Sequence, residues 1–156
     1  MITKNKISIK NLADHRRYIP LVSKWLWQQF HKRHGISLKE IIYRTRHCLT
    51  KKCPQTLIAF YNGQPAGTVS LWNADYRYRQ DLTPWASVLF VLPKYRRRGI
   101  GQALQAAVLK TAKQAGYKKI YLMSELKNYY EKTGWRFMEI GPYTEGRKIR
   151  LYEHKL

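Results

Sequence analysis

Hydrophobic and polar residues near the N-terminus follow two different periods. Residues 6–10, Lys-Ile-Ser-Ile-Lys, alternate between polar and apolar side chains and predict a short edge strand. Apolar residues then recur at helical spacing after Pro20, a residue that is favoured in the first turn of a helix. A second helical pattern begins at residues 37–40, Ser-Leu-Lys-Glu, which have the sequence of a capping box. The pattern therefore predicts one strand followed by two helices.

The middle of the chain shows the two-residue period of strands. Residues 56–61 and 64–72 are strand-like, and the Asn-Gly pair between them is the strongest short signal for a β-hairpin. Residues 73–84 are polar, aromatic and charged and predict a loop, after which Trp85 resumes the strand pattern. We expect an antiparallel pair that leads into a central sheet.

An uninterrupted apolar run follows. Residues Val88 to Val91 predict a central strand covered on both faces, and Pro93, which cannot donate to a β-ladder, ends it. From Gly101 small and apolar residues recur at helical spacing until Gly116 supplies a stop. The sequence predicts a strand, a basic turn and a helix in direct succession.

The last third of the chain predicts three more strands and one short helix. The strands are residues 119–123, 135–140 and 148–153, the helix is 126–133, and turns are expected at Gly141-Pro142 and Glu145-Gly146. No repeat, linker or low-complexity segment interrupts the chain. We therefore expect one domain over residues 1–156.

The turn before the long helix has the features of an anion site. Gly99 and Gly101 allow a tight turn, and the free N–H groups and positive dipole end of the helix face whatever binds there. Neither standard nucleotide pattern fits. A P-loop ends in Gly-Lys-Ser/Thr, and the dinucleotide fingerprint requires a small residue where Leu104 stands.

Residues 96–101, Arg-Arg-Arg-Gly-Ile-Gly, resemble the acetyl-CoA signature Arg/Gln-x-x-Gly-x-Gly/Ala of the GCN5-related N-acetyltransferase (GNAT) superfamily, including the preceding strand that ends in Val-x-Pro. The resemblance implies that the loop amides hold the pyrophosphate of coenzyme A and that the strand pairs with its pantetheine arm. The alternative is a basic turn before a core helix without a ligand. The resemblance assigns acetyl-CoA binding to Phe90, Val91, Arg96, Arg97, Arg98, Gly99, Ile100 and Gly101.

A second motif lies at residues 129–135, Tyr-Tyr-Glu-Lys-Thr-Gly-Trp, and resembles the other GNAT signature, in which a tyrosine precedes Glu-Lys-x-Gly-Phe or Trp. One helix and one strand separate the two motifs, in the order that the family fold requires. The resemblance implies an α/β fold with a mixed, mostly antiparallel seven-stranded sheet flanked by about four helices.

The activity that the resemblance implies is transfer of an acetyl group from acetyl-CoA to a primary amine. A backbone N–H near Phe90 or Val91 would meet the thioester carbonyl, and the Tyr130 hydroxyl would protonate the departing thiolate. Tyr129 is the neighbouring alternative, but a helical step of about 100° should aim it elsewhere. Tyr130 as a packed structural side chain is the other alternative. Asn128 is a candidate for the pantetheine arm, although the family's asparagine normally lies further upstream, where this chain has Ser124.

The acceptor site is less defined. In the family the connection before the central strand lies beside the acceptor, so Asp81 and Trp85 are candidates for its wall, unless Trp85 belongs to the core. Asp81, Glu125 and His47 have the right chemistry for a general base, water can also serve, and none is assigned. The acceptor is a small-molecule amine or a peptide or protein amine.

Charge bears on the choice of partner. The chain has 30 Lys and Arg against 9 Asp and Glu, a net charge of +21. Such a field attracts acidic peptides and phosphorylated metabolites and repels polycationic amines, unless a local acidic pocket around Asp75, Asp81 and Glu125 reverses the preference. A basic module that binds nucleic acid or ribosomes without catalysis is the rival interpretation. Its basic residues should form one stripe, whereas here they are spread along every segment.

Several expectations concern what the chain lacks. It has no apolar run long enough to cross a membrane and no signal-like N-terminus, so we expect a cytoplasmic protein. The two cysteines, Cys48 and Cys53, are too few for a zinc pattern, and we expect reduced thiols and no metal. The histidines at 31, 34 and 47 are interpreted as surface residues. The sequence does not distinguish a monomer from a homodimer.

Overall fold

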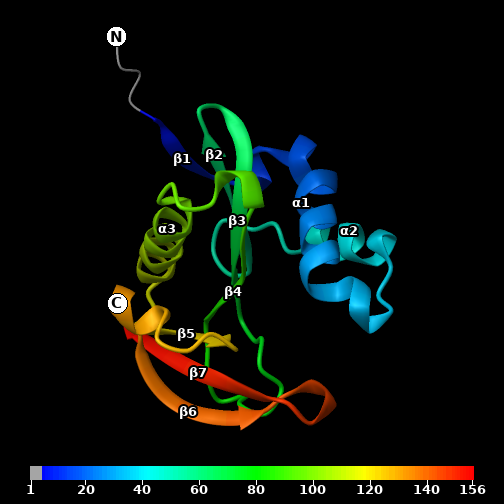
Figure 1. The fold of residues 1–156 in the computed structure, drawn as a ribbon. Helices are drawn as coiled ribbons and strands as arrows, with labels where there is room; N and C mark the ends of the chain where they lie inside the picture. Colours follow the sequence, from blue (N-terminus) through cyan, green and yellow to red (C-terminus); the bar gives the residue numbers. More distant parts are fainter. Residues whose placement is uncertain (1–4) are drawn as a thin grey trace.

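The computed structural model describes residues 5–156. Its strands are β1 Ile7–Asn11, β2 Gln55–Tyr61, β3 Gln64–Trp72, β4 Trp85–Val91, β5 Lys119–Ser124, β6 Arg136–Pro142 and β7 Lys148–Lys155. They form one sheet in the order β1-β2-β3-β4-β5-β7-β6 (Figure 1). Within residues 5–156, β4 and β5 are the one parallel pair of neighbours, and all other neighbours are antiparallel. The predicted mostly antiparallel seven-stranded sheet is confirmed.

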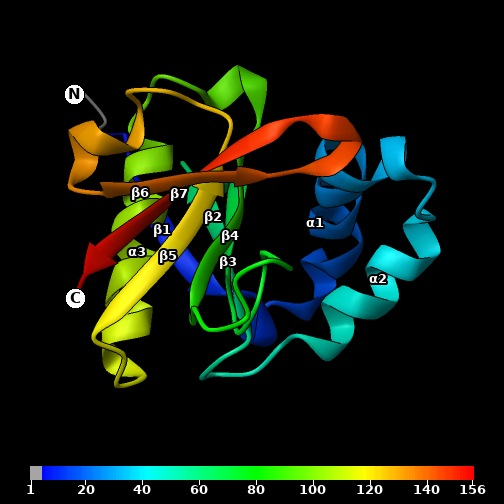
Figure 2. The same ribbon diagram turned by 90° about the horizontal axis from the view of Figure 1, so that it is seen from below.

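Three α-helices in the described residues cover the sheet: α1 Ile19–Leu26, α2 Leu38–His47 and α3 Ile100–Gln114. Figure 2 shows α3 on one side of the sheet and α1 with α2 on the other. The strand β2 has every residue buried because both of its faces are covered. Leu57 and Ala59 pack in the cluster beneath α3, and Ile58 and Phe60 pack in the cluster beneath α1 and α2. None of the helices between residues 5 and 156 is long and apolar enough to cross a membrane.

The local signals near the N-terminus have their expected structural counterparts. Pro20 lies in the first turn of α1. The Ser37 hydroxyl accepts a hydrogen bond from the Glu40 backbone N–H at 3.2 Å, which confirms the cap of α2. Asn62 and Gly63 both have positive φ, +49° and +79°, as the tightest hairpin turns require. Residues 1–4, on which part of the signal-peptide expectation rests, lie outside the described residues.

Two predictions in the last third were wrong. The helix expected at 126–133 is only a 3-10 turn over Tyr130–Thr133, because Asn128 has a left-handed φ of +58° that interrupts a helix. Gly141 and Pro142 belong to β6 instead of a turn, whereas the turn expected at Glu145-Gly146 is confirmed as the 3-10 turn Thr144–Gly146. Proline is tolerated in β6 because this is an edge strand, where a missing donor breaks no second ladder.

The strand β4 departs from its neighbour β5 along its length. The two strands pair at Trp85 and Tyr121, the one register pair between them in the described chain. Thr68 pairs with Phe90 and Ser70 with Ser87, so two residues of β4 lie opposite the single residue between Thr68 and Ser70. This bulge includes Val88, whose φ is +50°.

The split corrects the expectation that residues 88–91 are covered on both faces. These residues are only partly buried, whereas Trp85, before the bulge, is 0% exposed. The apolar run was interpreted correctly as a central strand but not as a fully covered one. Its apolar side chains pack against both core clusters, Leu89 and Val91 on one side and Val88 and Phe90 on the other, and they also line the two cavities.

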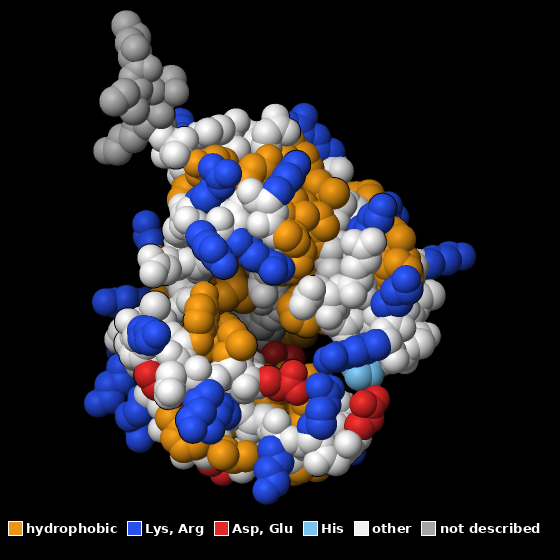
Figure 3. All heavy atoms as spheres, viewed as in Figure 1, with side chains coloured by type: hydrophobic (Ala, Val, Ile, Leu, Met, Phe, Trp, Pro, Cys, Tyr) orange, Lys and Arg blue, Asp and Glu red, His pale blue; other side chains and the backbone are white. Residues whose placement is uncertain are grey.

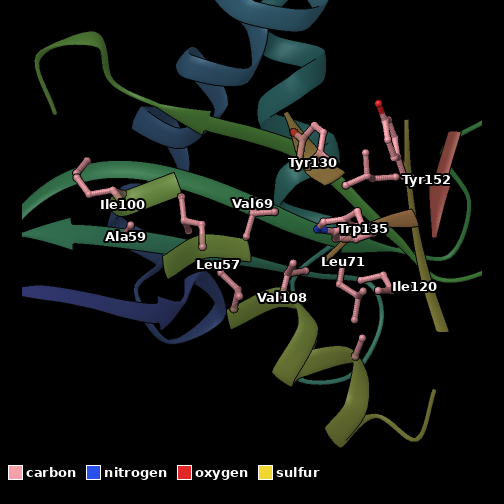
Figure 4. Packing of buried hydrophobic residues seen from close by; sticks show 14 of the residues in the cluster. Leu57, Ala59, Val69, Leu71, Ile100, Val108, Ile120, Tyr130, Trp135 and Tyr152 are labelled. Atoms are coloured by element: carbon pink, nitrogen blue, oxygen red, sulfur yellow. The ribbon is translucent and has the colours of Figure 1, made fainter. Parts of the chain in front are cut away.

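The core beneath α3 also includes residues from the C-terminal motif. Figure 4 shows Tyr130, Trp135 and Tyr152 packed at one end of the cluster that Val69, Leu71, Val108 and Ile120 continue. The second motif is therefore anchored in the same apolar core as the first helix turn, where Ile100 is 1% exposed. The positions of both sequence motifs therefore depend on the packed cluster beneath α3.

Gly67 allows β3 and β4 to approach closely beside this core. A Cβ atom there would lie 2.5 Å from the Phe90 carbonyl oxygen and 3.2 Å from Leu104 Cδ1. We expect Gly67→Ala to lower the free energy of unfolding by roughly 1–3 kcal/mol in urea titrations, because the backbone must shift. Gly35→Ala is the control: its Cβ meets nothing within 4 Å, so only the strain of its φ of +71° remains. A smaller loss for Gly67→Ala than for Gly35→Ala would contradict this account.

Candidate active site

A first cavity of about 660 Å³ opens where β4 ends and α3 begins. Sequence-predicted residues that line it are Phe90, Val91, Arg96, Arg97, Gly99, Ile100, Gly101 and Tyr130. Gln29, Leu89, Tyr95, Gln102, Leu126 and Tyr129 complete the lining. The fold thus brings together most of two motifs that are far apart in the sequence.

The turn that enters α3 leaves backbone donors free. Arg97 and Gly99 have φ values of +60° and +80°, and the first backbone bond of the helix runs from the Ala103 N–H to the Gly99 carbonyl at 3.0 Å. Within residues 5–156, the N–H groups of Ile100, Gly101 and Gln102 have no acceptor on the chain. Together with the helix dipole these donors form an anion-binding site at the edge of the cavity.

Tyr130 is held by aromatic side chains. Its ring is 8% exposed and lies edge-on to Tyr129 and Trp135, at centroid distances of 4.9 and 6.2 Å. Burial, with a smaller contribution from Tyr129 and Tyr152, raises the pKa of Tyr130 to about 12. No residue of the described chain accepts from or donates to its hydroxyl. The phenol is therefore protonated at neutral pH and free to donate.

A second cavity of about 540 Å³ adjoins the first. Gln29, Leu89, Leu126 and Tyr130 line both, so the two meet at the split between β4 and β5. Polar groups that line the second cavity include His31, Arg33, His34, Asp75, Ser87, Gln105 and Glu125. Figure 3 shows carboxylates gathered at the lower rim of the central hollow, while Lys and Arg side chains are spread over the rest of that face.

Asp75 is the carboxylate with the most perturbed environment. The Ser87 hydroxyl donates a hydrogen bond of 2.8 Å to its Oδ2. Burial raises the pKa of Asp75 from 3.8 to about 6, and the Ser87 hydrogen bond opposes that rise in part. Asp75 is therefore ionised at neutral pH in a site that disfavours its charge.

Comparisons with known proteins agree with this geometry. The model of the acetyltransferase (GNAT) family matches residues 19–135, which include both motifs and the split between the strands. The chain belongs to the GNAT acetyltransferase family. No curated protein matches the chain.

Solved structures of similar fold span almost the whole chain. A GNAT family acetyltransferase from Elizabethkingia anophelis with acetyl-CoA bound has a TM-score of 0.70 and 22% identity, covering 98% of this chain and 100% of its own. An aminoglycoside 6'-N-acetyltransferase complexed with coenzyme A has a TM-score of 0.74 and 14% identity, covering 95% and 96%. The NatC complex bound to Gag peptide and CoA has a TM-score of 0.72 and 18% identity, covering 97% and 99%. At these identities the likeness establishes the shared fold.

Two of the residues expected to bind acetyl-CoA, Arg98 and Asn128, lie outside both cavity linings. The Arg98 guanidinium stacks over the Tyr61 ring, 5.3 Å from its centroid, and donates to the Tyr61 hydroxyl at 3.3 Å. Asn128 is exposed and has positive φ, so the interrupted helix carries it away from the cavity. Arg96 does line the first cavity, and its Nε donates to the Val91 carbonyl oxygen at 3.0 Å.

The expected acceptor wall also differs. Trp85 belongs to the core, where its indole N–H donates to the Leu82 carbonyl at 2.7 Å. Asp81 is exposed and pairs with Arg79 at 2.7 Å. Neither residue lines either cavity; the same loop reaches the second cavity through Asp75 instead.

Of the general-base candidates, the structure places one in the cavity. Glu125 lines the second cavity and pairs with Arg147 at 2.7 Å. His47 lies outside both cavities, with its Nδ1 2.8 Å from the Tyr43 carbonyl oxygen. No group of three or more His, Cys, Asp or Glu side chains in residues 5–156 is arranged to hold a metal ion.

Sequence reasoning misjudged Tyr129 and did not single out Ser87 or Gln105. Tyr129 was expected to aim elsewhere, but it precedes the 3-10 turn instead of lying within a helix, and its ring lines the first cavity. Ser87 is the one polar side chain in the apolar strand Trp85–Val91, and Gln105 is a polar residue on a buried helix face. A polar residue at an apolar position was the signal that could have identified both.

Asp75 should make stability depend on pH in a defined direction. Because its pKa is higher in the folded protein than in the unfolded chain, the contribution of Asp75 to the free energy of unfolding falls as pH rises from about 4 to about 6. Asp75→Asn keeps the shape and the Ser87 partner but removes the charge. We expect the variant to be more stable than the wild type in urea titrations at about pH 7.5, and the difference to shrink toward pH 4.

The comparison between the two proteins isolates this carboxyl. The other ionisable groups that face the second cavity are His31, Arg33, His34, Glu125, Tyr130 and Tyr143. They are present in wild type and variant alike, so their contributions cancel in the difference to first order. A difference in stability that stays constant from pH 4 to pH 7.5 would refute the assignment.

Proposed function

We propose that this GNAT protein transfers the acetyl group of acetyl-CoA to a primary amine by direct attack, with acetyl-CoA in the first cavity and the amine in the second. The observation that supports this most is the junction of the two cavities. Leu89 and Tyr130 line both, so a thioester and an amine that entered from opposite sides would meet beside a free phenol. Bringing reactants together in this way supplies much of the rate enhancement of acyl transfer.

The first cavity fits the cosubstrate. The unpaired N–H groups at the start of α3, together with Arg96 and Arg97, favour a pyrophosphate. Acetyl-CoA supplies an activated acyl group on a thiolate leaving group. The neighbouring structures that contain acetyl-CoA or CoA share this fold, which supports the same placement here.

The backbone of β4 also offers a donor toward the split. The Leu92 N–H donates to Ala66 of β3 at 2.9 Å, whereas the Val91 carbonyl faces away from β3 and accepts from Arg96. Successive residues of a strand direct their backbone groups to opposite sides, so the Val91 N–H lies on the side of its carbonyl. Of the two expected residues, Phe90 and Val91, the geometry favours Val91 as the donor to the thioester carbonyl.

Tyr130 completes the set of groups that the reaction needs. Its pKa of about 12 keeps the proton on the phenol until a thiolate develops beside it. In this role Tyr130 is the general acid. The proton of the incoming amine must leave on the other side, where the second cavity contains the ionised Asp75.

Tyr130→Phe is expected to lower kcat by roughly 10²-fold while leaving the affinity for acetyl-CoA nearly unchanged, because only the donated proton is lost. Tyr129→Phe is the matched control, since Tyr129 also lines the first cavity but not the junction. Steady-state release of CoA and isothermal titration with acetyl-CoA measure the two quantities. A Tyr130→Phe variant with full turnover would remove this residue from the mechanism.

Gly99→Glu is expected to abolish acetyl-CoA binding, because it places bulk and negative charge at the helix start. Gly116→Glu is the control: Gly116 has a similar φ of +93° and lies just after the opposite end of α3, away from both cavities. Strain and net charge then change alike in both variants. Isothermal titration should show micromolar binding to the wild type and Gly116→Glu, and none to Gly99→Glu.

The same titration tests the rival function. Wild-type protein should prefer acetyl-CoA over an unrelated nucleotide of matched charge. Equal, salt-sensitive binding of every polyphosphate would mean that the loop is only a basic patch, and the nucleic-acid-binding interpretation would then be the better one.

A further inference from the structure

The second cavity contains one anion and one cation that no other residue neutralises. The Asp75 carboxylate has the Ser87 hydroxyl as its hydrogen-bond partner, and no cation of the described chain pairs with it. The Arg33 guanidinium donates through Nε to His34 at 3.2 Å and pairs with no carboxylate in residues 5–156. Glu125 is different, because Arg147 neutralises it at 2.7 Å.

His31, which also lines the second cavity, does not change this balance of charges. Burial lowers the pKa of His31, and the charges of Arg44 and His34 lower it further, against a smaller opposing effect of Glu40. His31 is therefore neutral at pH 7, and Arg33 is the permanent cation of the cavity. The cavity offers one negative and one positive group to a ligand.

A buried polar side chain with an unsatisfied donor also lines the second cavity. Gln105 is 5% exposed, and its Oε1 accepts from the Trp135 indole at 3.2 Å and from the Thr133 hydroxyl at 2.9 Å. Because an indole N–H can only donate, it fixes which end of the amide is the oxygen. The Gln105 Nε2 then has no partner in the described chain. A buried donor without an acceptor is costly, and an acceptor on a ligand would satisfy it.

We propose that the second cavity selects a compact acceptor that has both a primary amine and an anionic group, such as an α-amino acid, with the amine on Asp75 and the anion on Arg33. The proposal rests on the acetyl transfer proposed above and names its substrate class. A volume of about 540 Å³ is in the range of small-molecule sites. A polyamine would bring a second cation to Arg33, whereas an acceptor of opposite charges pairs both groups.

The test compares amino acids with their C-terminal amides, which keep the amine and lose the negative charge. CoA release is measured for both series with saturating acetyl-CoA. We expect kcat/KM for the acids to exceed that for the amides by roughly tenfold, the effect of one charge-assisted hydrogen bond. Spermidine, a polyamine, should be a poorer acceptor than either series.

Two variants assign the effect to its residues. Arg33→Met should reduce the ratio of acid to amide to about one while leaving the amides within about twofold of wild type. Arg46→Met, which changes an exposed arginine outside both cavities, is its control.

Asp75→Asn should lower kcat/KM for both series by roughly 10²-fold with unchanged acetyl-CoA affinity. Asp14→Asn is its control, because Asp14 pairs with Lys51 on the surface.

The outcomes separate this inference from the proposed function. Equal use of acids and amides, a preference that survives Arg33→Met, or a polyamine as the best acceptor would each overturn the substrate class while acetyl transfer stands. Binding of acetyl-CoA without turnover of any amino acid would also overturn the proposed substrate class. Failure of acetyl-CoA to bind would overturn the proposed function, and this inference with it.

Discussion

The divergence of β4 from β5 is the constraint on which the rest of the site depends. Neighbouring strands usually pair along their whole length, because a buried backbone N–H or C=O group without a hydrogen-bond partner is energetically costly. Here the bulge at Val88 ends regular pairing, and the ladder between the two strands is reduced to the pair of Trp85 and Tyr121. The opened gap exposes the Val91 backbone and creates two cavities that meet within it.

The apolar core makes this opening rigid. Tyr130 is at once part of the core and part of the cavity wall, since its ring packs on Trp135 and Tyr152 while its hydroxyl remains without a partner in the described chain. A polar group held this way cannot turn away to find a better hydrogen bond, which is the preorganisation that the proposed role of Tyr130 in acyl transfer would require. Trp135 is fixed in turn by Gln105, so the helix α3 supports both the anion site at its start and the tyrosine beside its middle.

Charge is distributed unevenly between the surface and the site. The net charge of +21 implies a field that attracts anions at long range, but the second cavity contains an ionised Asp75 at close range. For the acceptor proposed above, long-range steering and local recognition would therefore act on different groups of the same molecule. The raised pKa of Asp75 also implies that its charge costs stability in the folded protein, a pattern common where a residue is retained for function.

The local sequence alone determined most of the elements and the anion site, because hairpin turns, caps and helix starts depend on neighbouring residues. Examples are Asn62-Gly63, Ser37 with Glu40, and Gly99 before α3. The resemblance to the GNAT superfamily, which rested on two short motifs, gave the strand count and the family correctly.

The residues around the proposed acceptor site were decided by tertiary structure. Asp75 and Arg33 are distant in the chain, and nothing in their neighbours indicates that they line one cavity, whereas Asp81 and Trp85, which had the right chemistry, are turned to the surface and the core. The split between β4 and β5 is likewise invisible in an apolar run, because a buried strand and a cavity wall require the same side chains and differ only in what lies opposite them.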